Sequence, residues 1–247
     1  MISKEKQKFI RNLHKKSNRI DLWLFLVEWE KSILELLNSG IKIKNLYLSE
    51  KFINKNNDNL KDIEYISSDE KTIEKLSTIK SNNSGIAIAI TPKNKELEIE
   101  KNEITIILDT INDPGNLGTI IRICDWYWIK NIIASKQTVE FTNPKVISST
   151  MWSISRVNIV YTDLENYLSN KNDNLDVYWA FLEWENIHKI KNEKNIWKYI
   201  IIWNESNWIS NQVEKFVTKK ITIPSFWWAE SLNAWVACWI IIDNFKR

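Results

Sequence analysis

The stretch at residues 104–122 reads ITIILDTINDPGNLGTIIR and gives the clearest indication of the fold class. It opens with an uninterrupted apolar run at 104–108, which is typical of a strand buried on both faces of a sheet. A turn rich in proline and glycine follows, and a helix is expected from 118 to 125. A buried strand, a tight turn and a helix in this order predict one unit of a parallel α/β sheet.

The same alternation continues to the end of the chain. Further strands are expected at residues 132–134, 157–160, 176–181, 199–202 and 221–223. Helices are expected between them at 144–151, 164–168, 210–217 and 231–245. The order predicts a largely parallel sheet with helices on both faces.

The first part of the chain predicts a smaller α/β domain. Strands are expected at residues 24–27, 46–48 and 86–90, helices at 31–39 and 70–76, and a polar, Asn-rich loop at 54–62. Residues 91–102 contain Pro92 and alternating charges, which indicates a linker. We therefore expect one domain at residues 1–95 and a second at 96–247.

The N-terminal run is basic, although the chain has a net charge of only +3. Its basic residues are Lys4, Lys6, Lys8, Arg11, Lys15, Lys16 and Arg19, against the single acidic Glu5. Such a run can contact phosphate backbones. The alternative interpretation is a solvated helix end.

Composition argues against several other classes of protein. Cys124 and Cys238 lack CxxC spacing and are expected to be reduced packing residues, as is usual in the cytoplasm. With only His14 and His188 and no Cys or His cluster, no metal site is expected. The charged start leads to no apolar segment, and no run is long enough to span a bilayer, so we expect a cytoplasmic protein without a membrane partner.

Tryptophan is unusually frequent and glycine unusually scarce. The 247 residues include 14 tryptophans and 4 glycines, whereas average usage predicts about 17 glycines. Every tryptophan except Trp126 stands where a turn or tight packing calls for glycine, as Trp29, Trp128 and Trp203 do. We infer that the sequence was translated with UGA read as Trp, whereas the source organism reads UGA as Gly. The alternative is a genuinely Trp-rich protein that stacks sugars or bases.

Three loops carry candidate functional residues at the carboxyl ends of expected strands, where open α/β sheets bind ligands. The first is NDPGNLGTIIR (residues 112–122), in which Asn116 and Arg122 are expected to look toward the loop from the start of the helix. A charge such as Arg122 within an apolar helix is costly unless it has a partner. The alternative is an Asn cap of the helix together with a structural Arg salt bridge.

The second loop is IIIWNESNWIS (residues 200–210), which becomes IIIGNESNGIS if Trp203 and Trp208 are glycine. Glycine there would let the main chain approach a flat heterocycle or an amino-acid moiety closely. The third loop ends at Ser231 and Asn233, which are expected to open the last helix. Helix N-terminal amides favour an anion or a polar ligand, and the alternative is a Ser cap and nothing more.

Together the three loops resemble the SpoU/TrmH family of RNA 2′-O-ribose methyltransferases. The resemblance rests on NLGTIIR (116–122), WNESNW (203–208, read as GNESNG) and IPSFWWAESLN (223–233), with weaker similarity in FLVEWEK (25–31). It implies a SPOUT α/β fold with a C-terminal trefoil knot, S-adenosylmethionine as methyl donor, and a homodimer that completes each site. It also implies an L30e-like N-terminal domain that binds RNA.

The resemblance assigns residues one by one. The positions matching the family's active site are Asn116, Arg122, Glu205, Ser231 and Asn233. The positions matching its donor-binding site are Ile202, Trp203, Asn204, Ile223, Pro224 and Leu232. Authentic tryptophan at 203 would fill the donor pocket.

The implied reaction is attack of a ribose 2′-hydroxyl on the donor's methyl group. A hydroxyl is a poor nucleophile, so its proton must be polarised or accepted, and the resemblance gives this role to Arg122. An ordinary Arg cannot act as a base, so the conservative interpretation is that Arg122 holds an RNA phosphate. Structured RNA is the expected substrate, with ribosomal RNA favoured over transfer RNA. An inactive RNA-binding or ribosome-assembly protein and a base methyltransferase are the alternatives.

Overall fold

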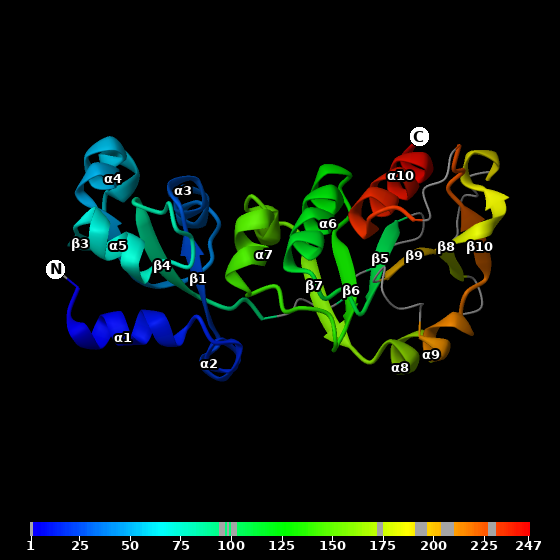
Figure 1. Cartoon of the computed structure of the whole chain (residues 1–247), viewed down its shortest axis with the longest axis horizontal. Helices are drawn as coiled ribbons and strands as arrows, with labels where there is room; N and C mark the ends of the chain where they lie inside the picture. Colours follow the sequence, from blue (N-terminus) through cyan, green and yellow to red (C-terminus); the bar gives the residue numbers. More distant parts are fainter. Residues whose placement is uncertain are drawn as a thin grey trace. The chain divides into compact units, whose positions relative to one another are not determined.

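The computed structural model describes residues 2–93, 97, 99, 103–171, 175–190, 197–203, 210–226 and 231–247, the side chains of 182, 183 and 211 excepted. The chain forms two compact units (Figure 1). Unit 1 comprises Met1–Lys93 and Thr142–Ser155, and unit 2 comprises Asn94–Phe141 and Arg156–Arg247. The chain therefore enters unit 2, returns to unit 1 and enters unit 2 again. The domain boundary expected at residue 95 stays a prediction.

Unit 1 is built on a four-stranded mixed sheet of order β1-β4-β2-β3. The strands are β1 (Leu24–Glu28), β2 (Ile43–Ser49), β3 (Ile66–Ser68) and β4 (Gly85–Ile90). The helices are α1 (Lys4–Asn12), α2 (Lys16–Leu22), α3 (Glu30–Leu37), α4 (Glu50–Lys55), α5 (Glu70–Leu76) and α7 (Pro144–Ser149), with short 3-10 helices η1 (Asn57–Leu60) and η2 (Ser153–Ser155). Strand β4 runs antiparallel to β1 and β2, and β3 runs parallel to β2.

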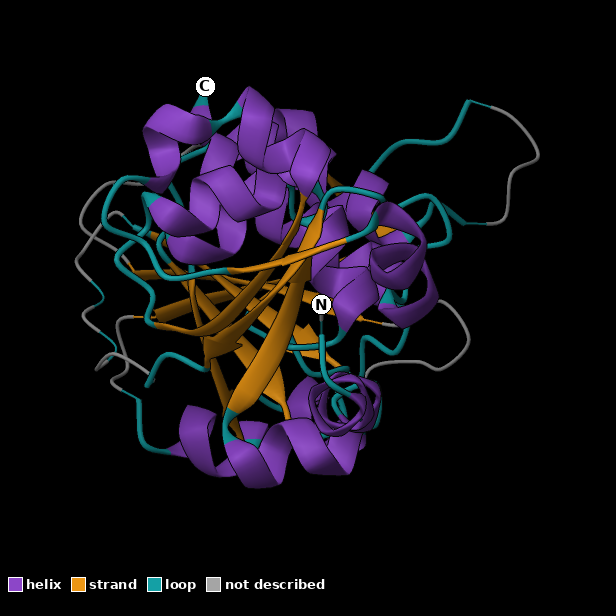
Figure 2. Ribbon diagram, turned by 90° about the vertical axis from the view of Figure 1, so that its left-hand side faces the viewer, coloured by secondary structure: helices purple, strands orange, loops and turns teal. Residues whose placement is uncertain are grey.

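Both faces of the unit 1 sheet are covered, because successive side chains of a strand point to opposite faces. Phe25 and Val27 of β1 lie in a core with residues of α3, α4 and α7. Leu24 and Leu26 lie in the opposite core with residues of α1 and α5. Figure 2 shows helices in purple on both sides of the orange strands.

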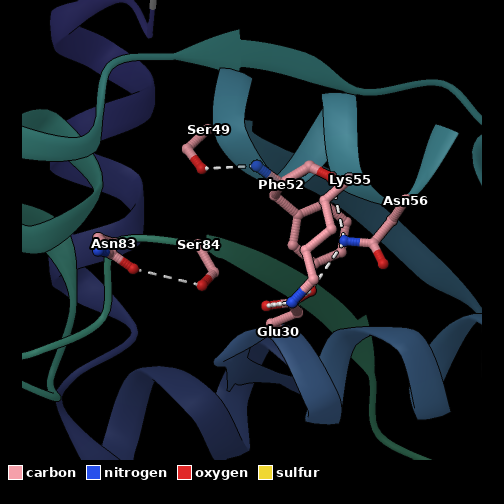
Figure 3. A network of polar contacts seen from close by, with 7 residues as sticks. All are labelled: Glu30, Ser49, Phe52, Lys55, Asn56, Asn83 and Ser84. Carbon is pink, nitrogen blue, oxygen red and sulfur yellow. Dashed lines mark hydrogen bonds and ion pairs between the residues drawn. The ribbon is translucent and has the colours of Figure 1, made fainter.

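Residues 54–62, expected to be a polar loop, are partly helical. Helix α4 continues to Lys55, and η1 covers Asn57–Leu60. The buried side chains of Phe52 and Leu60 anchor this segment in the core, and the Ser49 hydroxyl caps α4 by accepting the Phe52 N–H (Figure 3). The expectation of a loop was wrong because two apolar residues outweigh the Asn-rich composition.

Unit 2 contains a six-stranded parallel sheet of order β10-β8-β9-β5-β6-β7, which confirms the predicted sheet type. Its strands are β5 (Ile104–Asp109), β6 (Asn131–Ser135), β7 (Asn158–Thr162), β8 (Leu175–Asn186), β9 (Trp197–Trp203) and β10 (Lys219–Thr222). Its helices are α6 (Pro114–Trp126), α8 (Leu164–Ser169), α9 (Asn211–Glu214) and α10 (Ala234–Lys246), with the 3-10 helix η3 (Ile187–Lys189). Helices α6 and α10 cover one face, and α8 and α9 cover the other (Figure 1).

The strand order reverses direction between β5 and β9. From β5 the chain continues to β6 and β7 on one side, whereas β9, β8 and β10 lie on the other. Such a reversal leaves a crevice at the carboxyl ends of the strands, where open α/β sheets bind ligands. The expected knot would run through segments that include 204–209 and 227–230, which lie outside the described residues, so it stays a prediction.

Helix α6 ends in a Schellman motif with a left-handed residue, Trp128 (φ 56°). The Ile129 N–H donates to the Cys124 carbonyl over 2.8 Å, and the Trp128 N–H donates to the Asp125 carbonyl over 3.1 Å. This motif most often places glycine at the left-handed position, because glycine has no Cβ to clash there. Trp128 therefore occupies a backbone conformation that favours glycine.

Candidate active site at the carboxyl edge of the parallel sheet

The loop that follows β5 is held rigidly by buried hydroxyl groups. Thr110 has a left-handed φ of 59°, and its N–H donates to Ser135 Oγ over 2.9 Å. The Ile111 N–H donates to Thr138 Oγ1 over 3.2 Å. Ser135 and Thr138 are both buried, and their hydroxyls are 3.0 Å apart. The loop that carries the first candidate residues is thus fixed to the end of β6.

Helix α6 begins at Pro114, earlier than the expected residue 118. Its N-cap is Asp113, whose carboxylate accepts the Asn116 N–H over 2.8 Å. Proline fits the first helical position because no N–H is needed there. The interpretation of an Asn cap was therefore wrong, and Asn116 lies half-buried in the first turn of the helix.

Arg122 lies in the second half of α6 with an exposed side chain. Within the described part of the chain it has no hydrogen-bond or ion-pair partner, so the structural salt bridge considered as an alternative is not found there. At about 100° per residue, Asn116 and Arg122 leave the helix on different sides. A guanidinium exposed in this way is available to an external anion.

The second candidate loop starts at the end of β9. Ile202 is buried opposite Leu108 of β5, and Trp203 is half-buried opposite Asp109. The indole of Trp203 packs edge-on against that of Trp179, with ring centroids 5.6 Å apart. Asn204, Glu205 and Trp208, the other predicted positions of this loop, lie outside the described residues.

Asp109 is a residue at this edge that sequence reasoning missed. It ends β5 and is only 5% exposed. Its Oδ2 accepts the Ser210 N–H and its Oδ1 accepts the Thr110 hydroxyl, each over 3.0 Å. The available signal was an acidic residue directly after an apolar strand, in front of the first loop.

The third candidate loop follows β10. Ile223 and Pro224 come directly after this strand and are half-buried. Helix α10 begins at Ala234, and Asn233 is its N-cap, accepting the Trp235 N–H over 3.0 Å. The expectation of a helix from residue 231 with a Ser cap was wrong, because the Asn233 amide takes that role. Ser231 and Leu232 are exposed and precede the helix.

Helices α6 and α10 are joined by a polar contact near their ends. The Tyr127 hydroxyl donates to Asp243 Oδ1 over 2.9 Å and accepts the Trp239 Nε1–H over 3.0 Å. Burial, and then the bond to Asp243, raises the pKa of Tyr127. Burial also raises the pKa of both Cys124 and Cys238, which are free thiols as expected. These contacts fix α10 beside α6.

In the described ranges, no three His, Cys, Asp or Glu side chains gather in a group that could hold a metal ion. None of the helices within those ranges combines the length and apolarity needed to cross a membrane.

Solved structures share this fold over the whole chain. A putative RNA methyltransferase of the TrmH family from Porphyromonas gingivalis aligns with a TM-score of 0.85 and 25% identity, over 99% of this chain and 98% of that one. An AdoMet-bound rRNA methyltransferase from Sinorhizobium meliloti aligns with a TM-score of 0.87 and 22% identity, over 100% and 96% of the two chains. The fold therefore belongs to the SPOUT class of α/β methyltransferases.

The sequence comparisons identify the family. The SpoU rRNA Methylase family matches residues 103–243, and the MRM3-like substrate binding domain matches residues 4–87. The 23S rRNA (guanosine(2553)-2′-O)-methyltransferase RlmP of Bacillus subtilis is 24% identical over 98% of this chain and 96% of that protein. This chain belongs to the SpoU rRNA methylase family and is an RNA methyltransferase.

Proposed function

We propose that this chain transfers the methyl group of S-adenosylmethionine to a ribose 2′-hydroxyl of ribosomal RNA. The match of the SpoU family to residues 103–243 carries the proposal, because this span contains all three candidate loops. The whole-length similarity to the Bacillus subtilis 23S rRNA enzyme favours ribosomal RNA. Transfer RNA is the second candidate, since a tRNA (guanosine(18)-2′-O)-methyltransferase of Aquifex aeolicus is 22% identical over 61% of this chain.

The proposed roles follow from where the side chains lie. Arg122 is exposed and offers several N–H donors in a planar fork, so it holds an RNA phosphate and favours loss of the 2′-hydroxyl proton. Asn116 and Asn233 stand at the starts of α6 and α10 and order the loops there. Ser231 and Glu205 stay predicted active-site positions, as the family resemblance implies.

The donor fits the carboxyl edge of the sheet if position 203 is glycine. The donor supplies an electrophilic methyl group on a sulfonium sulfur. Around it, the main chain at Ile202 and Trp203 would accept and donate hydrogen bonds and the Pro224 carbonyl would accept one, with the side chains of Ile223 and Leu232 beside it. The indole now at 203 is half-buried at this edge, so glycine would leave the main chain bare. Asn204 stays a predicted donor-binding position outside the described residues.

We further infer that every tryptophan except Trp126 is glycine in the natural protein. The left-handed positions of the described backbone include Trp23, Trp29, Trp128 and Trp152, with φ of 54°, 80°, 56° and 73°. At Trp29 the ψ of 144° adds a combination that is nearly restricted to glycine. Peptide mass spectrometry of the protein from its source cells tests this inference. Tryptophan found at residues 23, 29, 128 and 152 would end it.

Buried indole groups support the same inference. The Nε1–H groups of Trp152 and Trp179 are buried and have no hydrogen-bond partner among the described residues. A buried donor without an acceptor costs about 1–3 kcal/mol. Glycine at these positions removes that cost.

Unit 1 is proposed to bind the RNA. Its α1 presents Lys4, Lys6 and Lys8 to solvent, and basic side chains of this kind contact phosphates without reading sequence. Arg19 is excluded from this role, because it is only 3% exposed and donates to the Leu13 carbonyl over 2.9 Å. The L30e-like assignment of this unit stays a prediction.

A homodimer in the cytoplasm completes the proposal. Exposed Trp126 and half-buried Val236 and Ile240 give α6 and α10 an apolar outer surface, and Trp126 lies about one helical turn after Arg122. A second copy that covers this surface would bring further groups to the site. Light scattering after gel filtration tests the dimer, and the mass of one chain would contradict it.

Methyl transfer from labelled donor to RNA tests the function. The chain with glycine at the assigned positions should label ribosomal RNA, and Arg122→Ala should lower the rate by about 10²-fold or more. Arg156→Ala is the matched control, because Arg156 belongs to the same unit and pairs with Asp125 over 2.7 Å. Its rate should stay close to that of the parent.

The position of the methyl group separates the alternatives. Nuclease digestion followed by mass spectrometry should find a phosphodiester that resists cleavage beside the methylated ribose. A methyl group on the base would indicate a base methyltransferase. RNA binding without transfer would indicate an inactive assembly protein.

A further inference from the structure

One buried residue of β5, Asp109, adjoins both the last residue of β9 and Ser210. The backbone of Asp109 lies opposite Trp203 in the β5–β9 register. The side chain of the same residue accepts the Ser210 N–H over 3.0 Å. Residues 204–209 between these two points carry donor-binding and active-site positions expected from the sequence. A single residue of β5 is therefore paired with the end of β9 through its backbone and with Ser210 through its side chain.

The same carboxylate also contacts the first candidate loop. Its Oδ1 accepts the Thr110 hydroxyl over 3.0 Å. Thr110 is held in turn by Ser135, because its N–H donates to Ser135 Oγ over 2.9 Å. Asp109 is thus shared by the loop that leads to Asn116 and by the segment that follows β9.

The environment of Asp109 is unusual for a carboxylate. It is 5% exposed, and no cationic side chain among the described residues pairs with it. A carboxylate can accept about four hydrogen bonds, and a buried one without an ion-pair partner is costly. The hydrogen bonds from Ser210 and Thr110 offset part of this cost.

We propose that Asp109 is a positioning residue for methyl-donor binding. It acts through the Ser210 N–H and the Thr110 hydroxyl, and so holds Ser210 and the start of the first candidate loop beside the strand-order reversal. The inference rests on the proposed function, because it requires that the donor binds at this edge. It differs from a purely electrostatic role, in which the negative charge itself would attract the cationic donor.

Two substitutions of Asp109 separate these roles. Asp109→Ala removes both hydrogen bonds. Asp109→Asn removes the charge but keeps the geometry, since its carbonyl accepts the Ser210 N–H and its amide donates to a rotated Thr110 hydroxyl. Asp163→Ala is the control for loss of stability, because Asp163 caps α8 of the same unit by accepting the Asn166 N–H over 2.9 Å.

The test measures binding of S-adenosylhomocysteine by calorimetry to the full chain with glycine at the assigned positions. Asp109→Ala should raise Kd about tenfold or more, which corresponds to ~1.4 kcal/mol. The Kd of Asp109→Asn should stay within about threefold of the parent's, because asparagine keeps both hydrogen bonds. Asp163→Ala should bind like the parent at temperatures below its melting transition.

The outcomes distinguish this inference from the proposed function. A parent that binds and an Asp109→Ala variant that binds equally well would overturn the inference alone. An Asp109→Asn variant as weak as Asp109→Ala would also overturn it, because the charge and not the positioning would then matter. A parent that binds no S-adenosylhomocysteine would overturn both.

Discussion

Replacing Trp128 by glycine should stabilise unit 2, although it removes a large side chain. The side chain is 84% exposed, so little burial is lost. The left-handed conformation costs an L-residue about 1–2 kcal/mol, and glycine's greater freedom in the unfolded chain offsets part of this gain. The net expectation is about 1 kcal/mol of stabilisation, or roughly 2–4 °C in Tm for a chain of this size.

Trp126 provides a matched control two residues earlier. It is 80% exposed and is the last residue of α6, with helical backbone. Trp126→Gly should destabilise by up to about 0.5 kcal/mol, because glycine is the poorer helix former. Urea unfolding followed by far-UV circular dichroism measures both changes without relying on indole fluorescence. Equal destabilisation by the two substitutions would refute the argument from backbone conformation.

Three further predictions concern buried or paired groups. Hydrogen bonds from the side chains of Asn56 and Lys55 lower the pKa of Glu30 below its ordinary value of 4.5 (Figure 3). Ionised Glu30 therefore stabilises unit 1 above pH 4.5, and this contribution is lost as the pH falls through the folded pKa. In Glu30→Gln the free energy of unfolding should depend less on pH in the acid range, and an unchanged dependence would contradict this. Cys124 and Cys238 are buried, and burial raises the pKa of both thiols. A thiol reagent at pH 8 should therefore label both cysteines only after unfolding. Labelling of either cysteine in the native chain would contradict their burial. Glu28 is 4% exposed and accepts the Thr78 N–H over 2.8 Å. Glu28→Ala should therefore lower the free energy of unfolding, measured in urea, by about 1.5–3 kcal/mol. A decrease below about 0.5 kcal/mol would be too small for loss of a buried hydrogen bond to a charged group.

The sequence was sufficient for the parallel sheet but not for the segment 142–155. An apolar strand such as β5 is recognisable locally, because burial on both faces leaves no polar alternation. The sequence of a helix such as α7 indicates only that one face of the helix is apolar. The core of unit 1 includes Ile147 and Trp152. This packing depends on tertiary contacts, which a local sequence pattern does not predict.

Helix starts were missed for a related reason. Helix α6 begins directly after its N-cap Asp113, and α10 begins directly after its N-cap Asn233. In each case several nearby polar residues could have capped the helix, and the backbone conformation determines which of them does so. Residue types that favour caps are therefore predictable, whereas the residue that serves as cap is not.

The candidate site was located by resemblance, and its physical basis came from the sheet order. Nothing in the local sequence places β9 beside β5. Once this pairing is known, Asp109 lies opposite Trp203 and within hydrogen-bond distance of Ser210. A contact that joins residues about a hundred positions apart in the chain is beyond pattern reading, which explains why Asp109 was not predicted.

The 2′-O-methyl map of ribosomal RNA, from source cells with and without the gene, is the decisive test of ribosomal RNA methylation by this protein. Deleting the gene should abolish 2′-O-methylation at one nucleotide or a small set, and the encoded chain should restore it while Arg122→Ala does not. An unchanged map in the deletion strain would contradict ribosomal RNA 2′-O-methylation by this protein.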